Sequence, residues 1–500
     1  MKKTLIISTI AAAAMSLTGC NMDLRPEGTI DPDNALESIN DADRLRDGLY
    51  IAFRGRVGGA FAYLDEIRSD LFHASASFDN NGGMMYNWIW TSADSDVAGI
   101  WSNSYYAIAN ANFFIEAANA VNTSEWSEED RENLQIWKGE AFFVRAYFHL
   151  ELAEAFCLNY PGNEQSYGVP YVTVYNPTSD NSRYPNRGTL EETFSNILAD
   201  LDSAAAYVTT PGSVGSMWVT ADAVTALRAR TALEMGDYSS VIDLVSEDFL
   251  MRYPLVTSEE AFQRMWINDD GSECILQFDA SYPNELGTSY DMGYIGYNAT
   301  EGIYSPTYLP EQWVVDLFQQ YPEDWRNTNH MIVRELNIGG TPYNLASFTK
   351  FPGNPALRQA ESDQNYQHKA KPFRIAEMYL VLAEAYARSS QMQQAANYLT
   401  RLRQGRIPGY VQDFQAGEVL SEIQDERVRE LMGEGFRIQD LKRFGEGVQR
   451  HAAQNSSTIY MPSNNEDFFR DASDFRMIFP IPQEEIDANP QIAGEQNPQY

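Results

Sequence analysis

Acidic residues toward the carboxyl end of the chain are spaced in a way that could support acid–base chemistry. In the segment DERVRELMGEGFRIQDLKRF, glutamates recur every fourth residue at Glu426, Glu430 and Glu434. On a helix this spacing puts the three carboxylates on one face. Three arginines alternate with them in the same segment, namely Arg427, Arg429 and Arg437. We interpret the pattern as a structural ion-pair network that fixes helix packing.

Motifs of known catalytic chemistry are absent from the sequence. It contains no G-x-S-x-G, no H-E-x-x-H, no glycine-rich phosphate loop and no paired cysteine ligands. His149 lies in an apolar helical run, which predicts a core residue. A glycan hydrolase stays a remote alternative, because its carboxylate pair is defined by distance in space and the chain has 70 acidic residues.

Two oxygen-rich turns could coordinate a cation. They are NDDGSE at 268–273 and FDNNGG at 78–83. Neither has the ligand spacing of an EF-hand loop, so both are predicted to be plain turns. No metal or other cofactor is expected, and calcium at the second turn is the alternative.

Aromatic residues give the main candidates for ligand binding. The run NNGGMMYNWIWTSAD, residues 80–94, has Trp88 and Trp90 two positions apart, and residues 278–308 are rich in tyrosine. The C–H faces of a sugar stack on such rings while its hydroxyl groups bond to planar polar side chains, and the same set can hold an extended peptide. Core packing is the alternative for each ring, and for Trp101 it is the prediction, because this residue begins a helix-like run.

We therefore expect one shallow ligand site built from both aromatic loops. Its predicted residues are Arg68, Asp79, Asn81, Asn87, Trp88, Trp90, Tyr290, Tyr294, Tyr297 and Tyr304. The sharpest form of the prediction is that Trp88 or Trp90 stacks on the ligand with Asn87 beside it.

The elements expected to carry this site are paired helices. Apolar stripes at helical spacing predict one hairpin over residues 373–403 and another over 221–245, where Gly236 ends a helix and Asp237 caps the next. A third pair runs from residue 102 to Cys157. Long stretches near 54–100, 157–187 and 280–372 lack such stripes and are rich in glycine, proline, asparagine and tyrosine, which predicts large loops.

The amino terminus predicts export and lipidation. Lys2 and Lys3 precede an apolar run that ends in Leu-Thr-Gly before Cys20, a pattern similar to a bacterial lipobox. Residues 1–19 are thus expected to be a signal peptide, Cys20 to be acylated, and 20–500 to form a single domain. A buried free thiol is predicted for Cys157, with a disulfide to Cys274 as the alternative.

The overall charge limits the partners. Seventy acidic residues against 36 basic ones give a net charge of −34. A nucleic acid would be repelled by most of such a surface, so no nucleic-acid binding is expected.

Several segments together, in this order, resemble the SusD/RagB family of outer-membrane nutrient-binding lipoproteins. They are the lipobox followed by MDLRPEG, then GEAFFVRAYFHL, ALRARTALEMGDY, FRIAEMYLVLAEAYA, DERVRELMGEGFRIQDLKRFG and the closing MIFPIPQEEIDANPQIAGEQNPQY. The segments RDGLY, IRSD and QWVVDLF are most similar to the RagB side. The resemblance covers nearly the whole chain.

The resemblance implies a mainly α fold, with a tetratricopeptide-like scaffold of helical hairpins, large irregular ligand-binding loops and little β structure. It also implies a binding protein rather than an enzyme, anchored by lipid in the outer membrane and exposed at the cell surface. Such proteins cover a SusC-like TonB-dependent transporter and take part in nutrient uptake. The expected ligand is an oligosaccharide, with an oligopeptide as the alternative; a purely structural scaffold would be a different class.

Overall fold

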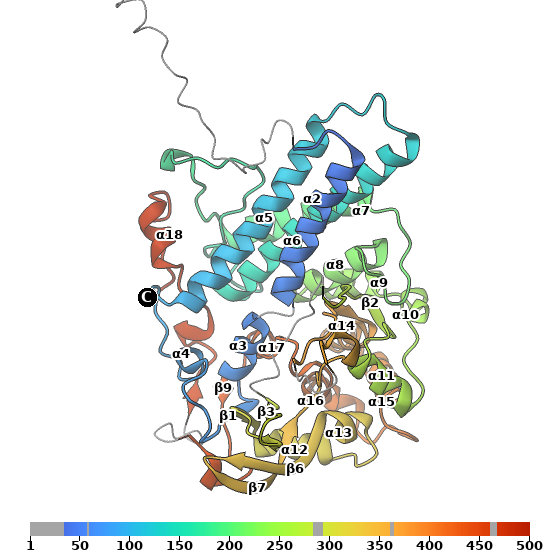
Figure 1. Cartoon of the computed structure of the whole chain (residues 1–500), viewed down its shortest axis with the longest axis vertical. Helices are drawn as coiled ribbons and strands as arrows, with labels where there is room; N and C mark the ends of the chain where they lie inside the picture. The colour runs from blue at the N-terminus through green and yellow to red at the C-terminus, as the bar shows by residue number, and fades with distance from the viewer. Residues whose placement is uncertain (1–34, 58–59, 284–293, 361–364, 461–467) are drawn as a thin grey trace, which may run out of the picture.

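Four long helices form the upper part of the molecule (Figure 1). They are α2 (Ile39–Val57), α5 (Ser95–Ala120), α6 (Glu128–Phe156) and α7 (Leu190–Tyr207). Helix α6 packs against both α5 and α7, and α2 packs against α5. The computed structural model describes residues 35–57, 60–283, 294–360, 365–460 and 468–500.

Helix α6 is central because its sequence has apolar residues on almost every side. Ala141, Val144, Phe148 and Leu152 are all at most 1% exposed, as the apolar stripe predicts. His149 is also buried: its Nδ1 donates to the carbonyl oxygen of Arg145 at 2.8 Å, and its Nε2 accepts from the backbone N–H of Val172 at 3.2 Å. The prediction of a satisfied core histidine is confirmed.

A second group of helices lies below the first. It comprises α8 (Ala221–Met235), α9 (Tyr238–Leu244), α14 (Ile375–Arg388), α15 (Met392–Gln404), α16 (Val419–Leu431) and α17 (Arg437–Phe444). Helix α14 packs against α8, α9, α15 and α16. Both predicted hairpins are confirmed: Gly236 ends α8 at φ 73°, and the Asp237 side chain accepts from the backbone N–H of Ser240 to cap α9.

The strands form five antiparallel pairs within the described ranges. These are β1 (Phe72–Ala74) with β5 (Tyr308–Pro310), β2 (Cys274–Leu276) with β8 (Phe373–Arg374), β3 (Tyr297–Asn298) with β4 (Ile303–Tyr304), β6 (Met331–Ile338) with β7 (Thr341–Phe348), and β9 (Val448–Gln449) with β10 (Phe469–Arg470). The longest pair, β6 with β7, lies at the lower end of the molecule (Figure 1).

The stretches predicted as loops contain more structure than expected. Residues 54–100 include α3 (Ala60–Arg68) and α4 (Gly83–Tyr86), and residues 280–372 include α12 (Gln312–Gln319), α13 (Trp325–His330) and five of the strands. Short helices elsewhere are α10 (Glu247–Arg252), α11 (Glu259–Ile267) and α18 (Gln483–Ala488). These helices have four to nine residues, which is too short for the periodicity of apolar residues to identify them.

The fold class is confirmed as mainly helical with little strand. None of the helices in the described ranges is long and apolar enough to cross a membrane. The signal peptide predicted for residues 1–19 and the lipidation predicted at Cys20 lie outside the described residues. Cys157 and Cys274 are both buried free thiols, as predicted for Cys157, and burial raises the pKa of each.

Candidate functional site

The two tryptophans expected to stack on a ligand are core residues instead. Trp88 is 0% exposed and Trp90 is 3% exposed, and their ring centroids are 5.1 Å apart. Residues 87–90 do not form a strand, because Trp88 takes a left-handed backbone angle, φ 55°, that turns the chain at this point. The indole N–H of Trp88 donates to the carbonyl oxygen of Arg68 at 2.8 Å, and that of Trp90 donates to the hydroxyl of Tyr500 at 2.9 Å. The prediction that either ring stacks on a ligand is therefore wrong.

Arg68 is not available to a ligand either. It is 0% exposed, its Nε donates to Oδ1 of Asp65 at 2.8 Å, and its guanidinium lies 4.3 Å from the centre of the Phe479 ring. Predicting it as a ligand contact is wrong, because the side chain points into the same core as the tryptophans.

Tyr294 is also a core residue. It is 2% exposed and its ring stacks on Phe72 with centroids 4.6 Å apart. Its prediction as a ligand contact is wrong for the same reason. Tyr290 lies outside the described residues.

The other predicted residues remain at the surface. Asp79 and Asn81 are exposed, and Asn87, Tyr297 and Tyr304 are half-buried. Asn87 closes its own turn, because its Nδ2 donates to the carbonyl oxygen of Gly83 at 2.9 Å. Tyr297 and Tyr304 pair across β3 and β4 with their ring centroids 4.8 Å apart.

The two aromatic loops lie side by side, although they are far apart in the sequence. Strand β1 pairs with β5, and the hydroxyl of Tyr308 donates to the carbonyl oxygen of Asn81 at 2.6 Å. The hydroxyl groups of Ser77 and Ser305 meet at 3.1 Å, and the same Ser77 hydroxyl accepts from the backbone N–H of Gly339 at 3.1 Å. Ser77 thus joins the asparagine turn to both tyrosine-bearing hairpins.

Sequence reasoning missed the part of this surface that the β6–β7 hairpin supplies. Tyr343 is half-buried beside Tyr304 on an apolar cluster, and the guanidinium carbon of Arg334 lies 4.3 Å from the centre of the Tyr304 ring. Among the described residues Arg334 has no carboxylate within ion-pair distance. We call Tyr297, Tyr304, Arg334 and Tyr343 the tyrosine platform. A Gly-Gly turn between two alternating segments, MIVRELNI and TPYNLASF, was the available signal.

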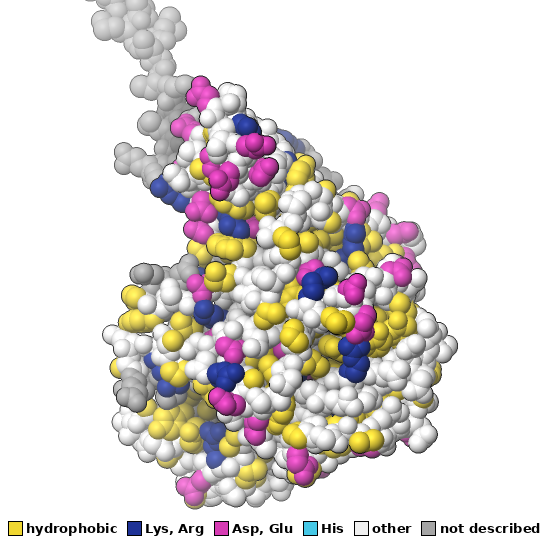
Figure 2. All heavy atoms as spheres, turned by 90° about the vertical axis from the view of Figure 1, so that its right-hand side faces the viewer, with side chains coloured by type: hydrophobic (Ala, Val, Ile, Leu, Met, Phe, Trp, Pro, Cys, Tyr) yellow, Lys and Arg dark blue, Asp and Glu magenta, His cyan; other side chains and the backbone are white. Residues whose placement is uncertain are grey.

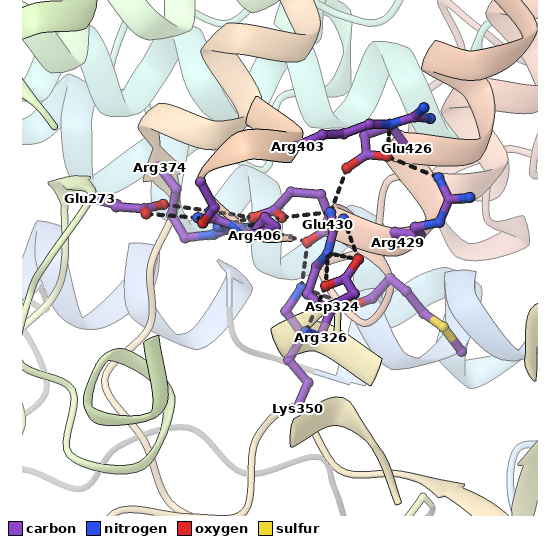
Figure 3. Close-up of polar contacts among 12 residues, drawn as sticks. Glu273, Asp324, Arg326, Lys350, Arg374, Arg403, Arg406, Glu426, Arg429 and Glu430 are labelled. Carbon is purple, nitrogen blue, oxygen red and sulfur yellow. Dashed lines mark hydrogen bonds and ion pairs between the residues drawn. The ribbon is translucent and has the colours of Figure 1, made fainter. Parts of the chain in front are cut away.

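The three glutamates Glu426, Glu430 and Glu434 belong to a buried ion-pair network (Figure 3). Glu430 accepts from Arg374 Nη1 at 2.8 Å, from Arg406 Nε at 2.9 Å and from Arg326 Nη1 at 3.1 Å. Glu426 accepts from Arg403 Nε at 2.8 Å and lies 2.7 Å from Arg326 Nη1. The structural interpretation is confirmed.

The partners in this network differ from those that the spacing suggested. Only Arg429 contacts a glutamate of its own helix, Glu426, at 2.9 Å, whereas Arg427 and Arg437 pair with Asp440 and Asp70. Helix α16 ends at Leu431, so Glu434 lies beyond the helix. It pairs with Arg374 and Lys350.

Electrostatics keep this network ionised. Burial by itself would raise the pKa of Glu426, but the guanidinium groups of Arg326, Arg403 and Arg429 outweigh it and lower the pKa to about 2. The pKa of Glu430 is likewise far below its ordinary value, because Arg406 and Arg374 outweigh its burial. Each carboxylate is held between several guanidinium groups and stays ionised, which makes it unsuited to moving protons.

The outer surface carries no broad basic area on the face that Figure 2 shows. Lysine and arginine side chains are dispersed there, and acidic side chains gather at the upper end. The exposed acids near the connection from α5 to α6 are Glu125, Glu128, Glu129 and Glu132. No group of three or more acidic, histidine or cysteine side chains in the described ranges is arranged to hold a metal ion.

Comparison with known proteins identifies the family. The family described as "SusD family" matches residues 319–500, and the family described as "Starch-binding associating with outer membrane" matches residues 31–233. This chain belongs to the SusD/RagB family. The SusD-like protein P38 of Formosa agariphila is 21% identical over 497 residues, covering 90% of this chain and 93% of that protein.

Solved structures of the SusD superfamily share the fold. A SusD superfamily protein from Bacteroides thetaiotaomicron is 24% identical with a TM-score of 0.78, covering 92% of this chain and 100% of that one. Surface glycan-binding protein A from Bacteroides fluxus is 18% identical with a TM-score of 0.70, covering 93% and 100%. At these identities the likeness concerns the fold, so the ligand of this SusD/RagB protein has to be argued from its own residues.

Proposed function

We propose that this protein is a non-catalytic, lipid-anchored protein of the outer-membrane surface that binds an oligosaccharide and delivers it to a SusC-like TonB-dependent transporter. The observation that carries the proposal is the tyrosine platform beside the exposed turn of Asp79 and Asn81. Half-buried rings offer an apolar face, and the amide, carboxylate and guanidinium groups next to them match sugar hydroxyl groups. Family membership supports the outer-membrane location and the transporter, and the lipobox at Cys20 supports the anchor.

Two features favour a glycan over a peptide. The rings of Tyr297 and Tyr304 lie on one hairpin with their centroids 4.8 Å apart and their planes at 44°, which offers apolar surface to the C–H faces of successive sugar units. The description of the family model that matches residues 31–233, "Starch-binding associating with outer membrane", also supports a polymeric sugar.

Binding can be tested on the full chain in detergent. Calorimetry against panels of polysaccharides and of peptides should give binding to a polysaccharide, and Tyr304→Ala should weaken it about fivefold, since an aromatic contact contributes ~1 kcal/mol. Tyr106→Ala is the matched control, because Tyr106 is 65% exposed on α5, away from the platform.

Three outcomes would count against the proposal. Binding of peptides alone would replace the oligosaccharide with an oligopeptide, and release of shorter sugars from a bound polysaccharide would indicate a hydrolase. An unchanged affinity in Tyr304→Ala would show that the platform is not part of the site.

Trp88→Phe separates folding from binding, because it should lower the melting temperature while the folded protein keeps its affinity.

The anchor and the transporter need separate tests. Labelling cells with a radioactive fatty acid should mark the protein, and Cys20→Ala should abolish the label. Purification from outer membranes through a tag on this chain should recover a large β-barrel transporter. Recovery of this chain alone would contradict the proposed partner.

A further inference from the structure

A cavity lies inside the molecule, apart from the tyrosine platform. Its volume is about 90 Å³, and its walls come from α3, α6, α8, α14, α16 and α17 together with residues 368–372 and 433–436. A buried water needs ~10–15 Å³ by this kind of measure, so the space holds several waters or one small molecule. None of its walls belongs to the tyrosine platform.

Gln439 of α17 is the first sign that the cavity is a binding site. The residue is only 7% exposed and lines the cavity, yet its amide has no hydrogen-bond partner within the described part of the chain. Its amide atoms keep some accessible surface and open onto this space without a protein partner there. A ligand or ordered water in the cavity would supply that partner.

Arg427 of α16 gives the same indication independently. Its Nε donates to Oδ2 of Asp440 at 2.7 Å, but its Nη1 is buried with no partner among the residues described. The residue is 3% exposed and lines the cavity. An unused guanidinium N–H therefore accompanies the unused amide of Gln439.

Two further side chains on the cavity wall are only partly used. Asp65 accepts from Arg68 through Oδ1, which leaves Oδ2 as an acceptor. Arg230 uses Nε and Nη2 on Glu377, at 2.7 and 2.8 Å, which leaves Nη1 as a donor. Donors and acceptors of both signs thus line one small space.

This mixture selects the chemical class of the ligand. A hydroxyl group both donates and accepts, so neighbouring hydroxyl groups can satisfy a carboxylate and a guanidinium together. A ligand with a single charge would meet a like charge on one wall whatever its sign, because Asp65 and Glu234 face the same cavity as Arg230 and Arg427, and a zwitterion would have to lose the hydration of two charges. Leu233 and Phe436 add apolar wall for C–H groups.

We propose that this cavity binds one neutral sugar ring, at a site separate from the platform that holds the oligosaccharide. The inference does not depend on the proposed function, because its residues and the tyrosine platform share no member. It assigns Gln439 and Arg427 as the groups that recognise the sugar hydroxyls.

The test is calorimetry of the full chain in detergent against free neutral monosaccharides, with free amino acids of neutral side chain, which are zwitterions, as the second panel. One or more monosaccharides should bind the wild-type protein, and Gln439→Leu should weaken binding at least tenfold. This variant should fold, because the Gln439 side chain has no partner to lose among the described residues. Gln404→Leu is the matched control, an exposed glutamine at the end of α15.

Each other result would overturn the inference. It fails if no monosaccharide binds, if only amino acids bind, if Gln439→Leu binds as wild type does, or if a crystal soaked in the sugar holds only water in the cavity. Tyr304→Ala distinguishes the two sites: it should lower polysaccharide affinity and leave monosaccharide affinity unchanged, whereas Gln439→Leu should do the reverse.

Discussion

The buried ion-pair network and the tyrosine platform use the same side chain, arginine, for different purposes. Inside the network, Arg326, Arg374 and Arg406 each bind two or more carboxylate groups and are at most 1% exposed. On the platform, Arg334 stacks on Tyr304 and has no carboxylate partner among the described residues. Carboxylates neutralise the arginines of the network, whereas the charge of Arg334 is not neutralised by any carboxylate of the described residues.

The difference shows how to tell structural charges from functional ones in this molecule. A charge whose hydrogen-bonding groups are all satisfied inside the fold contributes to the uniqueness and stability of packing, and its removal is costly. A charge held at the surface by an aromatic ring contributes little to stability. Measurements of stability and of binding should therefore separate the two regions.

Breaking the network should have the largest effect. Glu430→Gln removes the negative charge shared by Arg326, Arg374 and Arg406 and should destabilise the fold by about 3–5 kcal/mol. Urea unfolding followed by circular dichroism measures the loss. Glu129→Gln, an exposed residue in the first turn of α6, is the control. Equal stability of the two variants would show that the network is dispensable.

Acid should act on the same network. Since the pKa of Glu426 is about 2 in the folded state and near 4.5 otherwise, its contribution is complete above pH 4.5 and is lost as the pH falls toward 2. The free energy of unfolding should thus fall across this range, and Glu426→Gln should show a flatter profile. Chemical unfolding at intervals of pH measures both slopes, and parallel slopes would contradict the assignment.

Glu66 should behave in the opposite way, because its burial outweighs the nearby charge of Lys350 and no ion pair with it is present among the described residues. Burial raises its pKa to about 8, although its Oε1 accepts from the backbone N–H of Gly435 at 2.8 Å. A raised carboxyl pKa means that stability declines as the pH rises from 4.5 toward 8. Glu66→Gln should remove this decline and be more stable at pH 8 by about 1–3 kcal/mol. A less stable variant at pH 8 would show that the charged carboxylate is needed.

The smallest effect is expected on the platform. Arg334→Gln should change the free energy of unfolding by less than about 0.5 kcal/mol, because the guanidinium has no ion-pair partner to lose. Thermal unfolding next to wild type measures it. A loss as large as that of Glu430→Gln would place Arg334 among the structural charges and end the comparison.

Local patterns in the sequence were enough to predict the helices of the scaffold. The stripes of α6, α8, α14 and α15 and the cap at Asp237 depend on neighbours within a few residues, and the structure has them as predicted. The existence of an ion-pair network could be predicted, because the four-residue spacing of the glutamates is also a local pattern. The identity of the paired residues could not be predicted, since Arg326 lies 104 residues from Glu430.

The direction in which Trp88 and Trp90 point could not be read locally. It is fixed by the carbonyl of Arg68 and by Tyr500, the latter 410 residues from Trp90. Aromatic type was therefore a poor guide to exposure here, whereas the polar residues Asp79 and Asn81 of the preceding turn are exposed, and their contact with a ligand stays a prediction. Arg334 was missed because charged residues on strands are common, and only the position of Tyr304 distinguishes this one.

The joining of the two aromatic loops also bears on the order in which the chain folds. The hydroxyl of Ser75 donates to the carbonyl oxygen of Pro306 at 2.6 Å, across 231 residues of sequence. Helices α5, α6 and α7 are neighbours in sequence and can pair early, whereas contacts of such long separation pay a large loop-closure entropy and form slowly. The contacts that join these two loops are therefore expected to form late, and a chain interrupted before residue 306 would lack them together with helices α14, α15, α16 and α17.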